Sequence, residues 1–306
     1  MNQTYLKTAK LMTQVLALIA EEESFALKGG TALNLFVQDL PRLSVDIDLT
    51  NLPMENRDTS LKNISEALLR LSERIQKVFS PQQITPSILK EGGRKNIFKL
   101  QMFKDGLLVK IEPNLVFRGT VFTIEMLKLR PKAEKLLESS VLMKVLSNAD
   151  LYAGKICAAL SRQHPRDLFD LSILQKTGGL TNEIKQAFIV YLASGNKPMH
   201  EMLSPNWKNH ENLFEEEFSG MTVEDLTWEE IRDEGKLILA QIKKSLTKDE
   251  QDFLLSIKQG TPRWELMPFE HLKNLPSLQW KIMNVQKMKP SSQKEARKKL
   301  EKALKI

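Results

Sequence analysis

Two aspartates separated by one residue, Asp46 and Asp48, have the type and spacing that most directly suggest chemistry. They lie in segment 45–49 (VDIDL), where apolar and acidic residues alternate with the period of a β-strand. Because residues i and i+2 of a strand point to the same face, the segment presents two carboxylates side by side. Like charges at this spacing repel each other, and a divalent cation with oxygen ligands removes the repulsion. The pair therefore predicts a site for Mg²⁺, with Mn²⁺ as the alternative ion.

A third carboxylate, Glu112, lies in a later strand candidate at residues 107–113. A carboxylate on a strand next to the two aspartates would complete a site for two metal ions about 4 Å apart. One ion of such a pair activates an attacking hydroxyl group, and the other holds a triphosphate. The predicted metal ligands are therefore Asp46, Asp48 and Glu112.

A Gly-Gly pair precedes the aspartates, in the segment Lys28-Gly29-Gly30-Thr31 between a strand candidate at 25–27 and a helical pattern. Backbone N–H groups at such a turn approach phosphate oxygens closely, and the helix N-terminus adds a positive dipole. The Thr31 hydroxyl and the Lys28 ammonium can contact the same phosphates, although a lysine here is equally typical of a protein surface. These four residues form the predicted nucleotide-binding segment.

The bulk composition predicts a folded protein of two domains. The chain has 306 residues, of which 42% are hydrophobic, and this is enough to form a buried core. No apolar run approaches the roughly 20 residues that a bilayer requires, and the early run at 15–20 lacks the features of a signal peptide. The single cysteine, Cys157, cannot form an internal disulfide, which favours a cytoplasmic protein without a membrane partner.

The net charge of +7 is concentrated near the C-terminus. Residues 281–306 contain nine Lys or Arg and two Asp or Glu, whereas residues 211–234 contain ten Asp or Glu and one Arg. A basic terminal segment favours attraction to the phosphate backbone of a nucleic acid. A solvated terminal helix explains the same pattern equally well.

Hydrophobic periodicity predicts an α/β domain followed by a helical domain. Between two strand candidates, Asp105-Gly106 is a strong hairpin signal. Segment 147–150 (SNAD) has the pattern of a capping box, so a helix should start there, end before Pro165 and be followed by another helix. Beyond Gly178 the periodic segments are helical. The expected helices of the first half cover 5–20, 32–40, 59–79 and 151–163, and the expected strands cover 25–27, 45–49, 83–89, 96–103, 107–113 and 120–126.

Two stretches of the chain resemble a known family. Segments 27–33 (LKGGTAL) and 42–49 (RLSVDIDL) look like the opening signature of the AbiEii/AbiGii-type nucleotidyltransferases. These proteins are toxins of type IV toxin–antitoxin systems, and the MenT toxins are their relatives. Farther along, Lys155, Arg162 and the segment 166–170 (RDLFD) resemble the downstream lysine and aspartate motifs of the same family.

The resemblance, which spans about residues 25–175, implies a fold and a domain division. The fold is a polymerase-beta-like nucleotidyltransferase domain of α/β (α+β) class with a mixed sheet, in residues 1–145. An all-helical domain follows in residues 146–306 and carries the second half of the active site. 

The implied activity is transfer of a nucleotide from a nucleoside triphosphate to an acceptor, through Mg²⁺-dependent in-line attack on the α-phosphate. The first expectation for the acceptor is the 3′ end of tRNA, and a cognate antitoxin protein is the expected partner. Three alternatives stay open: an enzyme that modifies its antitoxin or itself, a non-catalytic protein that binds nucleotide or RNA, and a housekeeping tRNA-end polymerase.

The resemblance also implies roles for the downstream residues. Lys155 would neutralise charge on the β- and γ-phosphates, and Asp167 would orient Lys155 or the nucleotide. Together with the three metal ligands, these two complete the predicted catalytic set. Ser44 and Arg166 are carried over as nucleotide-binding residues. The alternatives are a Ser44 hydrogen bond that stabilises the turn before the strand, capping of the following helix by the acidic cluster, and mutual pairing of Arg166 and Asp170.

Other catalytic patterns are absent from the sequence. Its four histidines have no metal-ligand spacing, and it contains neither a Gly-x-Ser-x-Gly elbow nor a Walker-type Gly-Lys-Ser/Thr loop. Nucleotidyl transfer is therefore the chemistry that the residues favour.

Overall fold

The structure is a computed structural model that describes residues 3–91, 94–219, 221–222 and 226–305. The chain forms two compact units. The sheet unit comprises residues 1–151 together with 220–223, and the helical unit comprises residues 152–219 together with 224–306. Each unit is described by itself.

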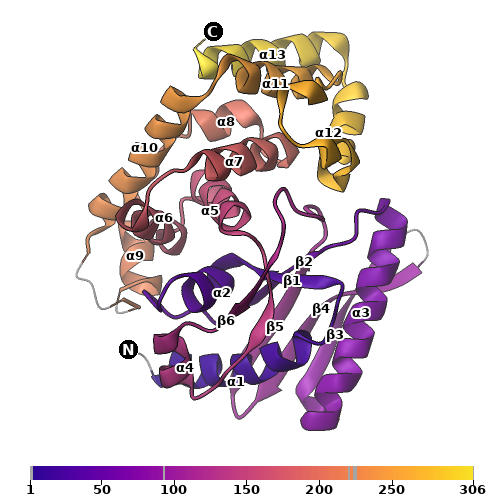
Figure 1. Cartoon of the computed structure of the whole chain (residues 1–306), viewed down its shortest axis with the longest axis vertical. Helices are drawn as coiled ribbons and strands as arrows, with labels where there is room; N and C mark the ends of the chain where they lie inside the picture. Colours follow the sequence, from indigo (N-terminus) through magenta and orange to yellow (C-terminus); the bar gives the residue numbers. More distant parts are fainter. Residues whose placement is uncertain (1–2, 92–93, 220, 223–225, 306) are drawn as a thin grey trace. The chain divides into compact units, whose positions relative to one another are not determined.

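The sheet unit is built on a seven-stranded mixed sheet with the strand order β3-β4-β5-β2-β1-β7-β6 (Figure 1). Strand β2 runs parallel to β5, and β1 runs parallel to β7, whereas the other neighbours are antiparallel. The central strands β5, β2 and β1 therefore lie side by side. The strands are β1 (Phe25–Lys28), β2 (Ile47–Asn51), β3 (Ile84–Glu91), β4 (Arg94–Lys104), β5 (Leu107–Asn114), β6 (Glu125–Lys128) and β7 (Leu142–Val145).

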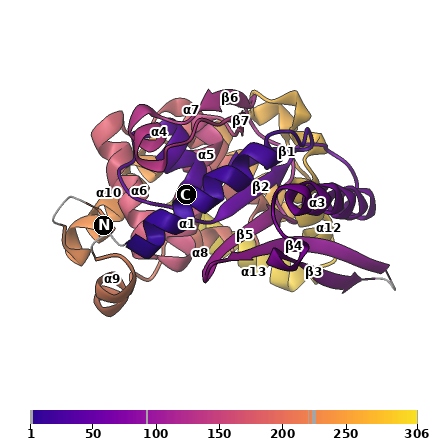
Figure 2. The ribbon, with the colours of Figure 1, turned by 90° about the horizontal axis from the view of Figure 1, so that it is seen from below.

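Two long helices, α1 (Gln3–Ile19) and α3 (Arg57–Val78), pack against the sheet and against each other (Figures 1 and 2). In α3 the fully buried residues Ile64, Leu68, Leu71 and Ile75 recur at the spacing of one helical face. Burying each such side chain stabilises the fold by about 1.5–3 kcal/mol. This packing gives the sheet one covered face and leaves the other face for polar side chains.

The hairpin signal at Asp105-Gly106 is confirmed. These two residues join β4 to β5, with φ angles of 50° and 75°. Positive φ at both central residues is what a type I′ turn requires, and it matches the right-handed twist of the flanking strands.

Three expected boundaries were wrong. Strand β2 begins at Ile47, so Asp46 precedes the ladder. A helix begins directly at Gly29 (α2, Gly29–Ala32), continues as a π-helix (η1, Leu33–Val37) and ends before Pro41 is reached. Of the strand expected at 120–126, only the end is extended, as part of β6, because earlier N–H groups donate elsewhere. The short apolar stretch 141–146, which the pattern left unassigned, contains β7.

In the described part of the helical unit the regular structure is helical, as expected. Capping boxes at Thr227 with Glu230 and at Thr247 with Glu250 start α10 and α11. None of the described helices is long and apolar enough to cross a membrane. The helices are α5 (Asn148–Arg162, which begins in the sheet unit), α6 (Pro165–Thr177), α7 (Asn182–Ser194), α8 (Met199–Leu203), α9 (Glu211–Glu217), α10 (Trp228–Ser245), α11 (Lys248–Gln259), α12 (Pro276–Gln286) and α13 (Pro290–Leu304).

The expected class, a mixed α/β sheet followed by helices, is thus confirmed. Its two halves are connected by the start of α5. There the Asp150 N–H donates to the Ser147 hydroxyl at 3.0 Å, as the capping pattern predicts. The Asp150 carboxylate in turn accepts from the N–H groups of Val121 and Phe122 at 3.0 and 2.9 Å, and this draws residues 121–122 out of the sheet.

We predict that Asp150→Ala lowers the free energy of unfolding by about 2–4 kcal/mol. The change leaves two N–H groups unpaired and removes the acceptor of the Ser147 hydroxyl, the residue that caps the helix. Denaturant unfolding monitored by circular dichroism measures the effect. The control Glu125→Ala, which removes an exposed carboxylate on β6, should stay within about 0.5 kcal/mol of the wild type. An equal decrease in the free energy of unfolding in the two variants would show that the hydrogen bonds accepted by the Asp150 carboxylate do not stabilise the fold.

Candidate functional site

The register of the central strands brings three of the predicted residues into one row. Lys28 on β1 pairs with Asp48 on β2, and Asp48 pairs with Glu112 on β5. Register partners on adjacent strands share a face of the sheet. Ile47 and Leu49, the neighbours of Asp48, are fully buried in the core, so Asp48 points to the face away from that core.

Gly29 provides the space that Asp48 occupies. Its φ of +73° lies in the left-handed region, and a Cβ atom built on it would overlap the Asp48 Oδ2 atom. The Asp48 Cβ and Cγ atoms would both lie 3.0 Å from the same Cβ atom. The sequence led us to expect close approach of a phosphate at this glycine. The structure adds a second requirement, since no side chain at position 29 is compatible with Asp48 in this position.

Thr31 connects the glycine segment to the aspartate strand. Its side chain is fully buried, and its hydroxyl donates to the main-chain carbonyl of Asp46 at 2.5 Å. The Thr31 hydroxyl oxygen also lies 3.1 Å from the Ser44 hydroxyl oxygen. In this structure Thr31 therefore fixes the residues that enter β2, and Ser44 contributes a contact to that turn. Their assignment as nucleotide ligands stays a prediction.

Glu112 has a partner other than a metal. Its carboxylate forms an ion pair with Lys99 on β4, although its side chain remains 41% exposed. Among the described residues, no three His, Cys, Asp or Glu side chains converge closely enough to hold an ion by themselves. Mg²⁺ is commonly bound by one or two carboxylates, with waters and substrate phosphates completing the shell. The donor chemistry of Asp46 and Asp48 fits that arrangement, whereas Glu112 would first have to release Lys99.

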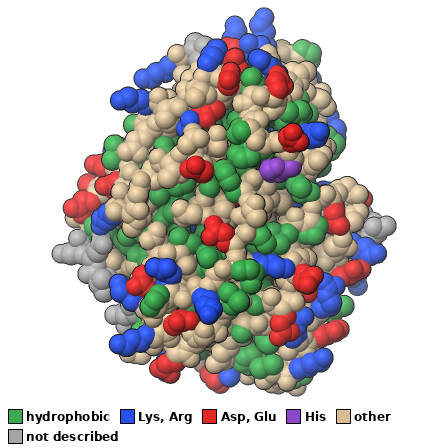
Figure 3. Space-filling view, in the orientation of Figure 1, with side chains coloured by type: hydrophobic (Ala, Val, Ile, Leu, Met, Phe, Trp, Pro, Cys, Tyr) green, Lys and Arg blue, Asp and Glu red, His purple; other side chains and the backbone are tan. Residues whose placement is uncertain are grey.

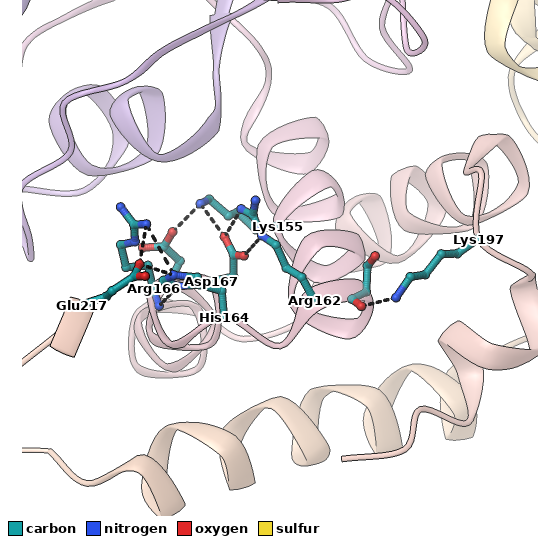
Figure 4. Close-up of polar contacts among 9 residues, drawn as sticks. Lys155, Arg162, His164, Arg166, Asp167, Lys197 and Glu217 are labelled. Carbon is teal, nitrogen blue, oxygen red and sulfur yellow. Dashed lines mark hydrogen bonds and ion pairs between the residues drawn. The ribbon is translucent and has the colours of Figure 1, made fainter. Parts of the chain in front are cut away.

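The helical unit holds a second group of charged residues, four of which pair tightly (Figure 4). Lys155 on α5 lies 3.2 Å from Asp167 Oδ1 and 2.7 Å from Asp170 Oδ2, both on α6. All three side chains are at most 8% exposed. Arg162, at the end of α5, binds both carboxylate oxygens of Asp167, with Nε at 2.5 Å and Nη2 at 3.0 Å.

These contacts set the charge of Asp167. Burial alone would raise the pKa of its carboxyl group, but Lys155 and the Arg162 guanidinium outweigh burial and hold the pKa well below its usual 3.8. Asp167 is therefore ionised at neutral pH, and it orients the Lys155 ammonium through a direct contact. That contact agrees with one of the two roles that the resemblance implies for Asp167.

Arg166 and His164 form a separate contact with Glu217 on α9 (Figure 4). The His164 Nδ1 atom accepts from the Arg166 N–H at 3.1 Å and so caps α6, while Nε2 lies 3.0 Å from the Glu217 carboxylate. The Arg166 guanidinium is 3.4 Å from the same carboxylate. Asp170 binds Lys155, and the alternative in which Arg166 pairs with Asp170 stays a prediction.

The basic terminal segment forms α12 and α13. Figure 3 shows Lys and Arg side chains gathered over α13. One face of this helix is packed, with Leu300, Ala303 and Leu304 buried, and its lysines are mostly exposed. Lys281 on α12 differs, since it donates to the Gly195 carbonyl at 2.6 Å, and burial with Lys258 nearby lowers its pKa to about 8. The segment is thus a docked helix with a basic outer face.

Arg162 and Lys99 form ion pairs at these sites but had no predicted role. The sequence contained a pattern that indicates the position of each. Arg162 follows Lys155 by seven residues, which places both on one face of α5. Lys99 lies opposite Glu112 because the two-residue turn at Asp105-Gly106 fixes the register of the hairpin.

The chain is similar to known proteins in both sequence and fold. The family model described as "Nucleotidyl transferase AbiEii toxin, Type IV TA system" matches residues 10–284. No curated protein sequence matches the chain. The solved structure of MenT4, a nucleotidyltransferase toxin from Mycobacterium tuberculosis H37Rv, superposes with a TM-score of 0.61. It is 15% identical, and the match covers 92% of this chain and 93% of that one. At this identity the likeness shows a shared fold.

We predict that Gly29→Ala and Gly106→Ala have different effects although both glycines have a φ near +75°. Each alanine pays about 1–2 kcal/mol for the left-handed conformation. Only at position 29 must Asp48 also move, since nothing lies within 4 Å of a Cβ atom at position 106. Binding of a nucleoside triphosphate with Mg²⁺ should therefore weaken at least about tenfold in Gly29→Ala alone. Equal affinities in the two variants would show that the Asp48 position does not matter for binding.

We also predict a pH dependence from His164. Burial, with a contribution from Arg166, lowers the pKa of this imidazole below its usual 6.5. The unfolded chain therefore binds the proton first, so stability is complete above about pH 6.5 and is lost as the pH falls through the folded-state pKa. His164→Asn keeps a capping acceptor without a titrating group. The wild-type free energy of unfolding, relative to this variant, should fall between pH 7 and 5, and a constant difference would refute the shift.

Proposed function

Because the chain belongs to the AbiEii family of nucleotidyltransferase toxins of type IV toxin–antitoxin systems, we propose that it transfers a nucleotide from a nucleoside triphosphate to the 3′ end of tRNA. The observation that carries the proposal is the row formed by Lys28, Asp48 and Glu112, with Asp48 seated against Gly29. This row places the carboxylates of Asp48 and Glu112 beside the glycine segment. Helix α2 begins in that segment, at Gly29. These are the two features that binding and activation of a triphosphate require.

The sheet unit would provide the acceptor-activating half of the reaction. The N–H groups at Gly29 and Gly30 bind phosphate oxygens, and Lys28 adds a positive charge at the end of β1. Asp46 and Asp48 would hold Mg²⁺, which when bound polarises phosphate oxygens and lowers the pKa of a bound hydroxyl group. The acceptor hydroxyl then attacks the α-phosphate, a new phosphodiester bond forms, and pyrophosphate leaves.

We assign Lys155 of the helical unit to the triphosphate. In this structure both of its partners are buried carboxylates, so its ammonium is held rigidly and its charge is balanced. Anionic phosphate oxygens can replace part of this contact, while Arg162 continues to balance Asp167. Asp167 is a positioning residue in this proposal, and Arg166, whose guanidinium faces Glu217, is the weakest of the proposed nucleotide contacts.

The cellular setting follows from the family. A cognate antitoxin protein is the proposed partner, and the cytoplasm, where nucleoside triphosphates and tRNA are found, is the proposed location. The exposed lysines of α13 provide a basic surface for an RNA acceptor. Modification of the antitoxin or of the toxin itself is the second candidate, and the macromolecule that carries the transferred nucleotide distinguishes the two.

We predict that Asp46→Asn abolishes transfer, by at least about 1,000-fold, and leaves the free energy of unfolding nearly unchanged. The change removes one metal-binding charge and keeps the shape of a side chain that contacts solvent. Purified protein is incubated with each of the four labelled nucleoside triphosphates, a tRNA pool, and Mg²⁺ or Mn²⁺. The matched control is Glu125→Gln, which removes an exposed carboxylate of the same unit and should keep full activity.

The label identifies the acceptor. Label on tRNA in the wild type supports the proposal, and label on protein alone supports the second candidate. No transfer with any nucleotide under either metal, or equal transfer by Asp46→Asn, would overturn the catalytic assignment and leave a binding protein.

A further inference from the structure

Arg118 is a buried cation that forms no ion pair with the described residues. It lies in the loop after β5, and the residue is 3% exposed. Its Nε and Nη1 atoms are fully buried without a hydrogen-bond partner, and no ion pair with the described residues is formed. A guanidinium stays protonated in proteins, so the desolvation of this charge is not offset by an ion pair with the described residues. Buried arginines are normally paired, and this exception requires a cause.

The nearest charges make the surroundings more positive. Burial lowers the pKa of Arg118, and Arg57 lowers it further, while Glu55 opposes them only in part. Both oxygens of the Glu55 carboxylate already accept from the Asn63 amide, at 3.0 and 2.9 Å. Arg57 is the first residue of α3, a helix of 22 residues whose N-terminus carries a partial positive charge. Two guanidinium groups and a helix N-terminus therefore lie within electrostatic reach of one another.

The position of this loop relates the cluster to the proposed active site. The Gly119 N–H donates to the Asn51 carbonyl at 2.8 Å, which fixes the residue after Arg118 at the carboxyl end of β2. Asp48 lies three residues earlier on the same strand, about 10 Å away along the chain. The loop that carries Arg118 therefore borders the strand that carries Asp48.

We propose that Arg118 and Arg57 bind a phosphate group of the substrate, a site that rests on the proposed nucleotidyl transfer and extends it beyond the glycine segment and the aspartates. A phosphate supplies the missing counter-charge and accepts in two directions from the planar guanidinium. It is more suitable than a monovalent carboxylate because Arg57, the first residue of α3, adds a second positive charge that acts on Arg118. The phosphate comes either from the nucleoside triphosphate or from the backbone of the acceptor RNA.

The test measures binding of inorganic pyrophosphate to the full chain at constant ionic strength, by calorimetry and by the rise in melting temperature. Arg118→Gln should weaken the affinity at least about tenfold, which corresponds to the loss of one charge-assisted contact. The matched control is Arg130→Gln, which removes an exposed arginine of the same unit and should bind like the wild type. Unchanged affinity in Arg118→Gln overturns the proposal.

Folding provides a second criterion. Since the Arg118 Nε and Nη1 atoms have no hydrogen bond that the substitution would break, Arg118→Gln without ligand should melt no lower than the wild type. A structural arginine would give a lower melting temperature with no change in pyrophosphate affinity, and that result also overturns the site. If Arg118→Gln does not fold, Arg57→Gln gives the same affinity comparison.

Two further measurements separate the sources of the phosphate and the two proposals. Weaker binding of nucleoside triphosphate alone in Arg118→Gln assigns the site to the nucleotide, and weaker binding of tRNA alone assigns it to the acceptor. Full transfer by Arg118→Gln with unchanged affinities removes this site and leaves the proposed function intact. If pyrophosphate binding depends on Arg118 but the wild-type chain transfers no nucleotide, the phosphate site stands and the proposed function is overturned.

Discussion

The hydrogen bond from the Thr31 hydroxyl to the Asp46 carbonyl is the contact on which the candidate site depends. It joins the segment that should bind phosphate to the strand that should bind metal, within a fully buried environment where an unpaired partner would cost about 1–3 kcal/mol. Gly29, two residues earlier, gives Asp48 its space. The glycine segment therefore determines where both aspartates lie, and the proposed phosphate and metal sites would share one support.

The two units differ in whether a buried cation is paired with carboxylates. Around Lys155, two cations pair with two carboxylates, so the positive and negative charges of this cluster are equal without any ligand. Among the described residues no carboxylate pairs with Arg118, and its Nε and Nη1 atoms are buried without a hydrogen bond to offset the cost of desolvation. Balanced groups give a site its rigidity, whereas an unbalanced one stores free energy that a bound anion can release. This difference is why Arg118, and not the larger cluster at Lys155, carries the inference of a new site.

Much of this arrangement could be predicted from the sequence because it follows from local patterns. Alternation in 45–49, the Asp105-Gly106 turn and the capping pattern at Ser147 each specify a short-range geometry. The errors arose where distant groups compete for the backbone. The segment at Val121, which was expected to be a strand, is held by Asp150 instead. The isolation of Arg118 could not be predicted, because nothing in a sequence reports the absence of a partner.

The isolated bridge between Arg42 and Thr222 has a consequence for synthesis of the chain. Arg42 directly precedes the turn into the aspartate strand, whereas Thr222 lies far along the chain and still belongs to the sheet unit. A ribosome that has released only residues 1–151 has therefore not delivered every part of that unit. Completion of the sheet unit must wait until the residues of α6 and α9, which precede Thr222 in the sequence, have been synthesised. During translation, the segment beside the proposed catalytic aspartates is among the last parts of the unit to be finished.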